Sequence, residues 1–381
     1  MIHKVTFRAR RAAWRTVVWR TVVLMAAALA VGTGAAEEPV VSRIAFGSCI
    51  KQDQPMPIWD AVIEASPQLF VFLGDNIYGD TLDIQLLRQK YAQLASQQGL
   101  RRLKQSCRIL GTWDDHDYGQ NDVGAEYPLK RQSQQAFLDF FEVPPDDPRR
   151  TQEGVYSATM VGPPGKRIQL ILLDGRYFRS PLKTGFKPGE PGDGYRGQYL
   201  PNLDPDSTLL GAAQWRWLEQ QLRVPAELRI IGSGIQILAD EHGSEKWGNF
   251  PHERRRLFEL IRTTGASGVV LLSGDRHLAE IARLPDSSPA TVGYPLYEVT
   301  SSSMNAPSGN ITKAGVRFAN EINSYRVGLT FFDVNFGAVM IDWEAADPIV
   351  RLQVRDEKGA VVLQQRFPLS QLNAPGANAP K

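Results

Sequence analysis

Short apolar runs recur along the first three quarters of the chain and alternate with amphipathic segments. The runs are rich in Val, Ile and Leu, which is typical of buried strands. The segments between them repeat their apolar positions with helical period. Since strands and helices alternate, the pattern predicts an α/β sheet. The predicted strands are 44–46, 69–73, 108–110, 168–173, 229–238 and 269–272, and the predicted helices are 58–65, 82–94, 129–141, 212–222 and 253–262.

The pattern changes after His277 to alternating strands at 280–283, 297–300, 328–333, 338–343, 349–354 and 361–367. The turn at 356–359, Asp-Glu-Lys-Gly, predicts a hairpin between the last two strands. We expect these strands to form a second sheet, face to face with the first and with helices outside. Residues 180–206, rich in Pro and Gly, predict one long surface loop that borders a site.

Chemically active residues follow five of the predicted strands. In open α/β sheets, ligands bind outside the carboxyl ends of the strands, so residues at these ends are expected to converge. The five ends are Gly47-Ser48-Cys49, Gly74-Asp75-Asn76-Ile77-Tyr78, Trp113-Asp114-Asp115-His116-Asp117, Asp174-Gly175-Arg176-Tyr177 and Gly274-Asp275-Arg276-His277.

These ends offer the ligand atoms of a multi-metal site. A single Asp after a strand, such as Asp75, can equally be an ordinary turn residue. The three carboxylates within 114–117 are different, because they repel one another unless a cation or the histidine neutralises them. Two cations about 4 Å apart can clamp the attacking and leaving oxygens of a phosphate ester. The residue types therefore predict phosphoester hydrolysis. The candidate ligands are Cys49, Asp75, Asp115, His116, Asp275 and His277.

In this order, the five blocks resemble the calcineurin-like metallophosphoesterases, and among them the PhoD-like (alkaline phosphatase D) family. Phe46 precedes the first block, Leu173 and Phe178-Arg179 flank the fourth, and Ser273 precedes the fifth. The resemblance implies a four-layer αββα sandwich, with two mixed β-sheets face to face and flanked by helices. It also implies export, a multinuclear site with iron and calcium, and hydrolysis of phosphate monoesters and diesters by a metal-activated hydroxide. Other divalent metals remain an alternative.

Carried over by this resemblance, Asp75 is the bridging carboxylate, and Cys49, Tyr78, Asp275 and His277 are further ligands. Asp115 stands where wider metallophosphoesterases place an Asn ligand, and its negative charge favours harder or higher-valent cations. A phenolate from Tyr78 with a thiolate from Cys49 suits ferric iron better than zinc.

The resemblance also places residues near the substrate. His116 is expected to protonate the leaving alkoxide or to hold a phosphoryl oxygen, with Asp117 orienting its ring. Arg176 and Arg179 are expected to bind phosphate through their planar guanidinium groups, with surface salt bridges as the alternative. Asn76 completes the predicted substrate-binding set.

The chain departs from the wider family pattern after the penultimate core strand. A His ligand is expected there, but the chain has Ser233 and Gln236. Either the Gln236 carbonyl or His242 reaching back is a possible replacement, and His252 is predicted to be a capping or surface residue.

In an exported protein, the two cysteines, Cys49 and Cys107, could form a disulfide. Cys107 opens the strand that leads to Asp114, so it is expected about 15 to 20 Å away, at the opposite edge of the sheet. A disulfide is therefore not predicted.

Residues 1–36 carry six basic and no acidic residues, followed by an apolar run at 21–31 and small residues up to Ala36. This pattern predicts a cleaved export signal, with Arg10-Arg11 leaving the twin-arginine route open. We predict a single domain at 37–372 and a flexible tail at 373–381.

Composition excludes several classes. With 381 residues and 43% hydrophobic content, the chain is neither disordered nor a coiled coil, and two cysteines exclude a disulfide scaffold and a zinc ribbon. Of its 43 basic residues, six lie in the leader, which leaves 37 against 41 acidic residues, so nucleic-acid recognition is not indicated.

We therefore predict an exported, periplasmic or extracellular phosphoesterase that is monomeric and has no membrane anchor after signal removal. Its substrate is a small-molecule or a lipid or polymer phosphate ester. The alternatives are a phosphodiesterase specialised for lipid or polymer phosphates, with 180–206 and 242–251 as the substrate wall, and an inactive phosphate- or glycan-binding module.

Overall fold

The computed structural model describes Met1 and residues 38–185, 199–288, 291–308, 318 and 320–373. The predicted export signal, residues 186–198 of the predicted long loop and nearly all of the predicted tail lie outside these described residues. In the described part of the chain, no helix has the length and apolar character needed to cross a membrane.

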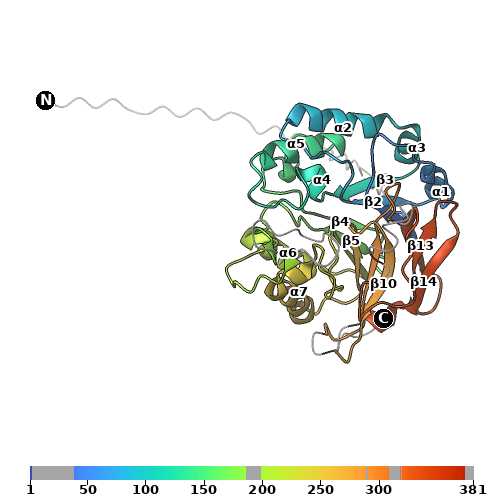
Figure 1. Cartoon of the computed structure of the whole chain (residues 1–381). Helices are drawn as coiled ribbons and strands as arrows, with labels where there is room; N and C mark the ends of the chain where they lie inside the picture. The colour runs from blue at the N-terminus through green and yellow to red at the C-terminus, as the bar shows by residue number, and fades with distance from the viewer. Residues whose placement is uncertain (2–37, 186–198, 289–290, 309–317, 319, 374–381) are drawn as a thin grey trace. The chain divides into compact units, whose positions relative to one another are not determined.

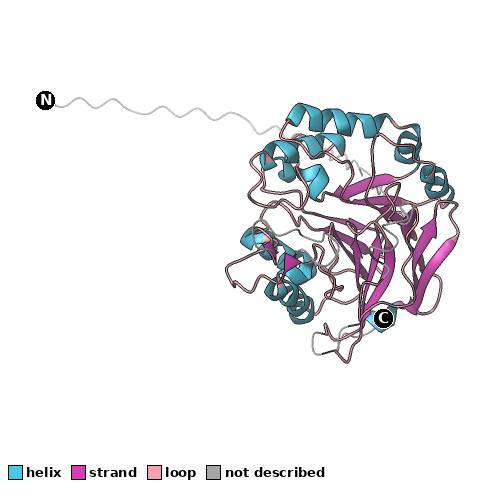
Figure 2. Ribbon diagram, viewed as in Figure 1, coloured by secondary structure: helices cyan, strands magenta, loops and turns pink. Residues whose placement is uncertain are grey.

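Twelve strands form two six-stranded mixed sheets, drawn as arrows in Figures 1 and 2. The first sheet has the order β14-β13-β12-β1-β2-β3, and the second has the order β10-β11-β9-β8-β5-β4. Strands β1, β2 and β3 are parallel, as are β5, β8, β9 and β11. The first sheet comprises β1 (Arg43–Gly47), β2 (Leu69–Leu73), β3 (Arg108–Thr112), β12 (Asn335–Asp342), β13 (Ile349–Asp356) and β14 (Val361–Pro368). The second comprises β4 (Ser157–Val161), β5 (Ile168–Leu172), β8 (Leu228–Ser233), β9 (Val269–Ser273), β10 (Ala279–Leu284) and β11 (Leu296–Ser301).

The helices cover the outer faces of the two sheets. Figure 1 shows α1, α2, α3 and α5 beside the first sheet, and α6 and α7 beside the second. Four of them lie on the first sheet: α1 (Ile58–Glu64), α2 (Ile84–Ser96), α3 (Gln98–Ser106) and α5 (Lys130–Phe140). The others are α4 (Asp115–Tyr118), α6 (Gly211–Leu222) and α7 (Pro251–Thr264), and a small ladder joins β6 (Lys183–Thr184) to β7 (Tyr199–Leu200).

Strand β2 shows why the layers form. Its residues Leu69, Val71 and Leu73 belong to the core that contains the second sheet, whereas Phe70 and Phe72 belong to the core with the outer helices. Alternate residues of a strand point to opposite faces, so an entirely apolar strand must be covered on both sides. The predicted four-layer αββα sandwich is confirmed.

The strands are divided between the sheets differently from the prediction. The early strands do not form one sheet: β1, β2 and β3 lie in the first, and β5, β8 and β9 lie in the second. The late strands do not form a sheet of their own, because β10 and β11 extend the second sheet while β12, β13 and β14 extend the first. Periodicity identifies a strand but does not determine its neighbours, which explains the error.

Some predicted boundaries are also wrong. The run at 229–238 leaves the sheet after Ser233, where a Cβ on Gly234 would lie 2.4 Å from Asp114 Oδ1. Residues 328–333 form no regular strand and contribute an isolated bridge between Phe331 and Ala279. Helix α3 and edge strand β4 were not predicted: α3 buries two residues, Leu100 and Leu103, and every residue of β4 is only partly buried. The predicted hairpin turn is confirmed, with Gly359 donating to the Asp356 carbonyl at 3.0 Å.

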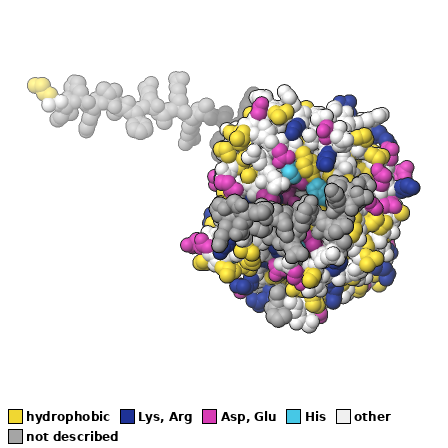
Figure 3. Space-filling view, viewed as in Figure 1, with side chains coloured by type: hydrophobic (Ala, Val, Ile, Leu, Met, Phe, Trp, Pro, Cys, Tyr) yellow, Lys and Arg dark blue, Asp and Glu magenta, His cyan; other side chains and the backbone are white. Residues whose placement is uncertain are grey.

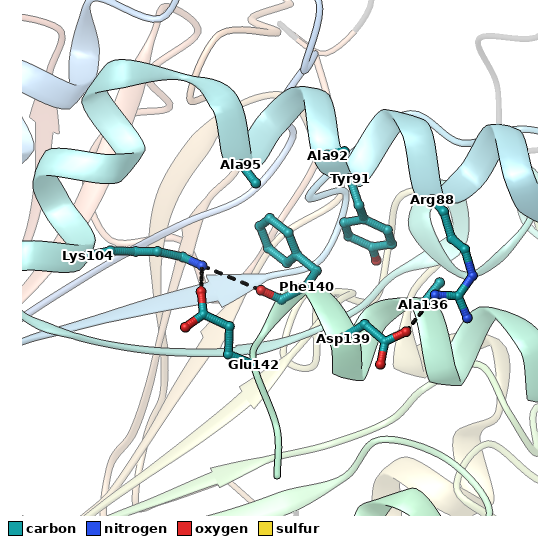
Figure 4. A pocket seen from close by; sticks show the side chains of 9 residues that line it. All are labelled: Arg88, Tyr91, Ala92, Ala95, Lys104, Ala136, Asp139, Phe140 and Glu142. Atoms are coloured by element: carbon teal, nitrogen blue, oxygen red, sulfur yellow. Dashed lines mark hydrogen bonds and ion pairs between the residues drawn. The ribbon is translucent and has the colours of Figure 1, made fainter. Parts of the chain in front are cut away.

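A pocket of about 260 Å³ lies in the helical layer between α2 and α5 (Figure 4). Ion pairs lie at its sides, Arg88 with Asp139 and Lys104 with Glu142, each at 2.5 Å. Tyr91 lines the pocket, and its hydroxyl group lies 3.4 Å from Asp117 Oδ2 at the end of the first sheet. The pocket itself contains none of the predicted ligands.

Candidate metal centre

The carboxyl ends of strands from both sheets meet at one edge. In the first sheet, Gly47 pairs with Phe72, and Leu73 pairs with Thr112, so the turns that follow are side by side. Thr112 Oγ1 donates to the Leu173 carbonyl at 2.7 Å and connects this edge to the second sheet. The predicted convergence of the strand ends is therefore confirmed. On the face shown in Figure 3, histidine and acidic side chains lie next to one another.

Four predicted ligands have unusual backbone conformations. The φ angles are 60° at Cys49, 49° at Asp75, 69° at Asp275 and 52° at His277. Left-handed conformations are costly for residues other than glycine and are concentrated at functional sites. The turn before Asp75 requires Gly74, since a Cβ there would lie 2.4 Å from the Asp114 Cβ. Packing thus holds these turns in strained positions that direct the ligands.

One side of the site contains sulfur, phenol and imidazole donors, from Cys49, Tyr78 and His277. Cys49 Sγ lies 3.3 Å from Asp75 Oδ2, and the Tyr78 hydroxyl lies 3.2 Å from His277 Nε2. His277 Nδ1 contacts the Ala306 carbonyl, which can only accept, so Nδ1 carries the proton and the Nε2 lone pair accepts from the Tyr78 hydroxyl. Burial lowers the pKa of His277 to about 4, which keeps the ring neutral. This is the usual orientation of a metal-binding histidine.

The acidic side is crowded with buried carboxylates. Ligand atoms lie within 4.8 Å of one another in each of three groups: Cys49 with Asp75 and His277, Asp75 with Asp115 and His116, and Asp114 with Asp115 and Asp275. Burial, followed by the charges of the neighbouring aspartates, raises the pKa of Asp75 well above its usual value. Burial also raises the pKa of Asp275 to about 7 and that of the Cys49 thiol well above its usual value.

These groups fit metal cations. Asp75 Oδ1 is buried without a hydrogen-bond partner, and buried anionic groups at such short range are unfavourable unless positive charge accompanies them. The donors combine thiol, phenol and imidazole at one end with carboxylates at the other. Borderline cations suit the first set and hard cations suit the second.

The carboxylates of the Asp114–Asp117 cluster have different partners, although burial and, after it, the charge of Asp115 still raise the pKa of Asp114 and of Asp117. Asp114 accepts from Arg176 Nε at 2.6 Å, and Asp115 accepts from the Asp122 amide at 2.7 Å. Burial alone would raise the pKa of Asp115, but Arg176 and His116 outweigh it and lower that pKa below its usual range. Asp115 is therefore the most firmly ionised carboxylate of the cluster.

Asp117 supports the turns and does not touch His116. It accepts from the backbone amides of Asp114 at 2.7 Å and Asp75 at 3.2 Å, and from Asn76 Nδ2 at 2.5 Å. Asn76 also donates to the Thr112 carbonyl at 2.9 Å, and its Oδ1 is buried without a partner.

His116 is oriented by Asp80. Its Nδ1 lies 2.7 and 2.9 Å from the two Asp80 oxygens, so the prediction that Asp117 orients the ring is wrong. Burial alone would lower the pKa of His116, but Asp115 and Asp80 overcome this effect and raise it to about 9. The ring is positively charged at neutral pH and partly exposed, with 16% of its side-chain surface accessible.

A family model described as PhoD-like phosphatase matches residues 44–350 of the chain. The chain belongs to the PhoD-like phosphatase family. The family resemblance carried by the five strand-end blocks is therefore confirmed.

Individual relatives of this PhoD-like chain are distant. Alkaline phosphatase D of Bacillus subtilis is 24% identical over 259 residues, which cover 61% of this chain and 42% of that protein. The chain thus spans less than half the length of that relative. The structure of PhoD aligns with a TM-score of 0.66 at 17% identity, covering 90% of this chain and 73% of that one. GAP50, the anchor in the inner membrane complex of Plasmodium, aligns with a TM-score of 0.52 at 13% identity, covering 88% and 90%. At these identities, the two structures show a shared fold.

In this PhoD-like site, the two predicted phosphate-binding arginines are fully buried. Arg176 Nη1 lies 2.7 Å from Glu245 Oε2, and Arg179 Nε lies 3.0 Å from Glu245 Oε1. Both arginines are 0% exposed, so the salt bridges of the alternative are present, but they are buried and do not lie at the surface. Their predicted contact with phosphate stays a prediction.

The candidates outside the PhoD-like motifs have other surroundings. Gln236 Nε2 donates to Glu280 and Thr300 at 2.8 and 2.9 Å. His242 is buried among cations, and His252 lies in the first turn of α7, where its Nε2 is 2.7 Å from the Ser207 carbonyl. Cys49 and Cys107 are free thiols, which confirms that no disulfide joins them.

Sequence reasoning missed three residues of this PhoD-like site. Asp80 follows the Tyr78 block by two residues, and its type alone resembles a turn residue. Ser302 lies 3.1 Å from Cys49 Sγ and directly follows β11, so applying the strand-end argument to one more strand identifies it. Glu245 lies in a long connection between β8 and α7 and carries no local signal.

Proposed function

We propose that the chain is an exported, metal-dependent phosphoesterase that hydrolyses phosphate monoesters, diesters or both at a multinuclear site. The observation that carries this proposal is the sharing of ligands between neighbouring groups. Asp75 belongs to two of the candidate groups and Asp115 to three, counting the group with Asp122 and Glu245. A multinuclear site requires such shared carboxylates, and an isolated single-ion site does not.

Iron and calcium are the proposed metals. Cys49, Tyr78, Asp75 and His277 would hold iron, since thiolate, phenolate and imidazole donors suit a borderline or higher-valent ion. Asp115 and Asp275, with further carboxylate oxygens nearby, would hold calcium, which prefers oxygen donors. When bound, the cations would supply an activated water and neutralise charge on the phosphoryl oxygens.

The proposed proton donor is His116. Its Nδ1 is engaged by Asp80, so Nε2 is the atom that would protonate the leaving alkoxide. Asp117 acts by holding the turns of Asp75 and Asp114. Asn76, Arg176 and Arg179 complete the proposed site. The buried ion pairs of the two arginines favour a role in fixing Asp114 and Glu245.

The test is nitrophenol release from 4-nitrophenyl phosphate and bis-(4-nitrophenyl) phosphate at alkaline pH, with and without chelator. We expect turnover that is abolished by the chelator and restored by metal. The ratio of the two rates ranks monoesterase against diesterase activity. His116→Ala is the matched variant and should retain metal while losing turnover. Folded, metal-replete protein that cleaves neither ester would refute the proposal and favour the binding-module alternative.

The location of the protein is also part of the proposal. The support is the basic leader and apolar run within residues 1–36, followed by Gly34-Ala35-Ala36. Expression of the full chain in a bacterial host, followed by fractionation and amino-terminal sequencing, should yield an exported form that begins near residue 37. Retention of an uncleaved chain in the cytoplasm would contradict it.

A further inference from the structure

Beside the metal centre lies a cluster of three buried basic side chains, His242, Lys246 and Arg276. They are 7%, 3% and 3% exposed, respectively. His242 and Lys246 belong to the connection between β8 and α7, and Arg276 follows β9. The cluster is therefore assembled at the carboxyl edge of the second sheet.

These side chains have donor atoms without acceptors. Among the described residues, neither ring nitrogen of His242 has a hydrogen-bond partner, and Arg276 Nε has none. Lys246 Nζ donates to the Ser244 carbonyl over a long 3.4 Å. The charges of Asp240 and Glu321 act on Lys246, but among the described residues these carboxylates pair with Arg254 and Arg276 instead. Buried donors without partners cost free energy, so such a group is stable when an acceptor enters it.

The rest of the surroundings fixes the cluster in place. Arg276 Nη2 is held by Glu321 at 2.7 Å, and its guanidinium carbon lies 4.7 Å from the centre of the Phe318 ring. Burial lowers the pKa of His242 well below its usual value, and the charges of Arg276 and Lys246 lower it further. A neutral ring has one N–H to donate. Glu321 compensates the charge of Arg276, and Asp240 and Glu321 act on Lys246 without pairing with it, so the positive charge that would attract an anion is mainly that of Lys246.

The cluster adjoins the place where a phosphate ester would react. Arg276 lies between the candidate ligands Asp275 and His277 in the chain. Lys246 directly follows Glu245, whose carboxylate lies within 4.8 Å of ligand atoms of Asp115 and Asp122. A group bound by the cluster would therefore be close to the metal centre without occupying it.

We propose that His242, Lys246 and Arg276 form an anion subsite that receives a second phosphate group of the substrate. The inference rests on the proposed function, and it specifies the substrate as a phosphate ester with one further phosphate near the scissile bond. Ammonium and guanidinium donors form strong charge-assisted hydrogen bonds with phosphate oxygens, and the imidazole N–H adds a third donor.

The test compares two matched diesters, 4-nitrophenyl glycerol phosphate and the same compound with a terminal phosphate on the glycerol. We expect kcat/KM of the wild type to be about tenfold higher for the second diester, which is the effect of about one charge-assisted contact. Lys246→Met should remove this preference and leave kcat/KM for the first diester within about twofold, as expected when one binding contact is lost. His242→Gln, a smaller change, should reduce the preference in the same direction.

Lys166→Met is the control, since Lys166 pairs with Glu344 at the opposite end of β5 and should change neither rate. Two results would overturn the subsite while the proposed function stands. The wild type could cleave both diesters in a chelator-sensitive way without preferring either. Alternatively, folded Lys246→Met and His242→Gln could lose kcat/KM equally for both diesters. Absence of cleavage of either diester by the wild type would instead count against the proposed function itself.

Discussion

Replacing Arg176 by Met tests how the acidic site is held together. Arg176 is fully buried, with Nε 2.6 Å from Asp114 Oδ1 and Nη1 2.7 Å from Glu245 Oε2. Met has a comparable length without charge, so the substitution removes the ion pairs while leaving little space. Asp114 is left as a buried carboxylate without its cation, whereas Glu245 keeps Arg179 at 3.0 Å.

The magnitude follows from this geometry. Removing one partner of a buried ion pair costs about 3 to 5 kcal/mol. Because Glu245 retains a second arginine, we expect the lower end of that range, about 3 kcal/mol. With a urea m-value of about 3 kcal/mol/M, as expected for a large domain, the midpoint of unfolding should fall by about 1 M.

Tryptophan fluorescence in urea measures this midpoint, with metal and after chelation, so that a change in metal affinity is separated from a change in the ion pair. Asp114→Asn added to Arg176→Met should recover more than about 1 kcal/mol, since it removes the unpaired carboxylate. Arg223→Met, which breaks an exposed pair with Glu219, is the control and should cost less than about 1 kcal/mol. An unchanged midpoint together with a raised KM would refute the reasoning, since it would identify Arg176 as a phosphate ligand.

The other predictions concern the proton donor, the iron ligands and the thiols. Asp80→Asn should lower kcat about tenfold and His116→Ala about 100-fold or more, both with metal content unchanged by elemental analysis; loss of metal in either variant would contradict these roles. Tyr78→Phe should lower iron content and remove any visible charge-transfer absorption; unchanged iron would show that the phenolate is not a ligand. Burial raises the pKa of Cys107 to about 11, so the neutral thiol dominates at pH 8 and its alkylation should accelerate about tenfold per pH unit up to pH 10. Buried Cys49 should be alkylated only after unfolding. Mass spectrometry measures both rates, and an alkylation rate of Cys107 that reaches a plateau near pH 8 would contradict the raised pKa.

The positions of the candidate ligands were predictable because their signals are local. Cys49, Asp75 and Asp115 follow the apolar runs that form β1, β2 and β3 of the first sheet, and Asp275 and His277 follow the run that forms β9 of the second. The parallel strands of each sheet bring their carboxyl ends to one edge. The apolar pattern within β2 likewise indicated a strand covered on both faces. These inferences require only the few residues around each strand.

The partners of these side chains were not predictable in the same way. Arg176 meets Glu245 across 69 positions of sequence, and His116 meets Asp80 across 36, although Asp117 is its immediate neighbour in the chain. The assignment of each strand to one of the two sheets could not be predicted from the sequence either. Such contacts depend on which strands become adjacent and on how the turns after them are bent.

The sequence by itself therefore determined the strand ends, their chemistry and the family. Tertiary structure alone decided the sheet order, the counter-charges of the buried carboxylates and the cluster around His242. The physical reason is the distance along the sequence over which each effect acts. Backbone alternation and strand-end placement act over a few residues, whereas charge compensation in a buried site depends on distances between residues that only folding brings together.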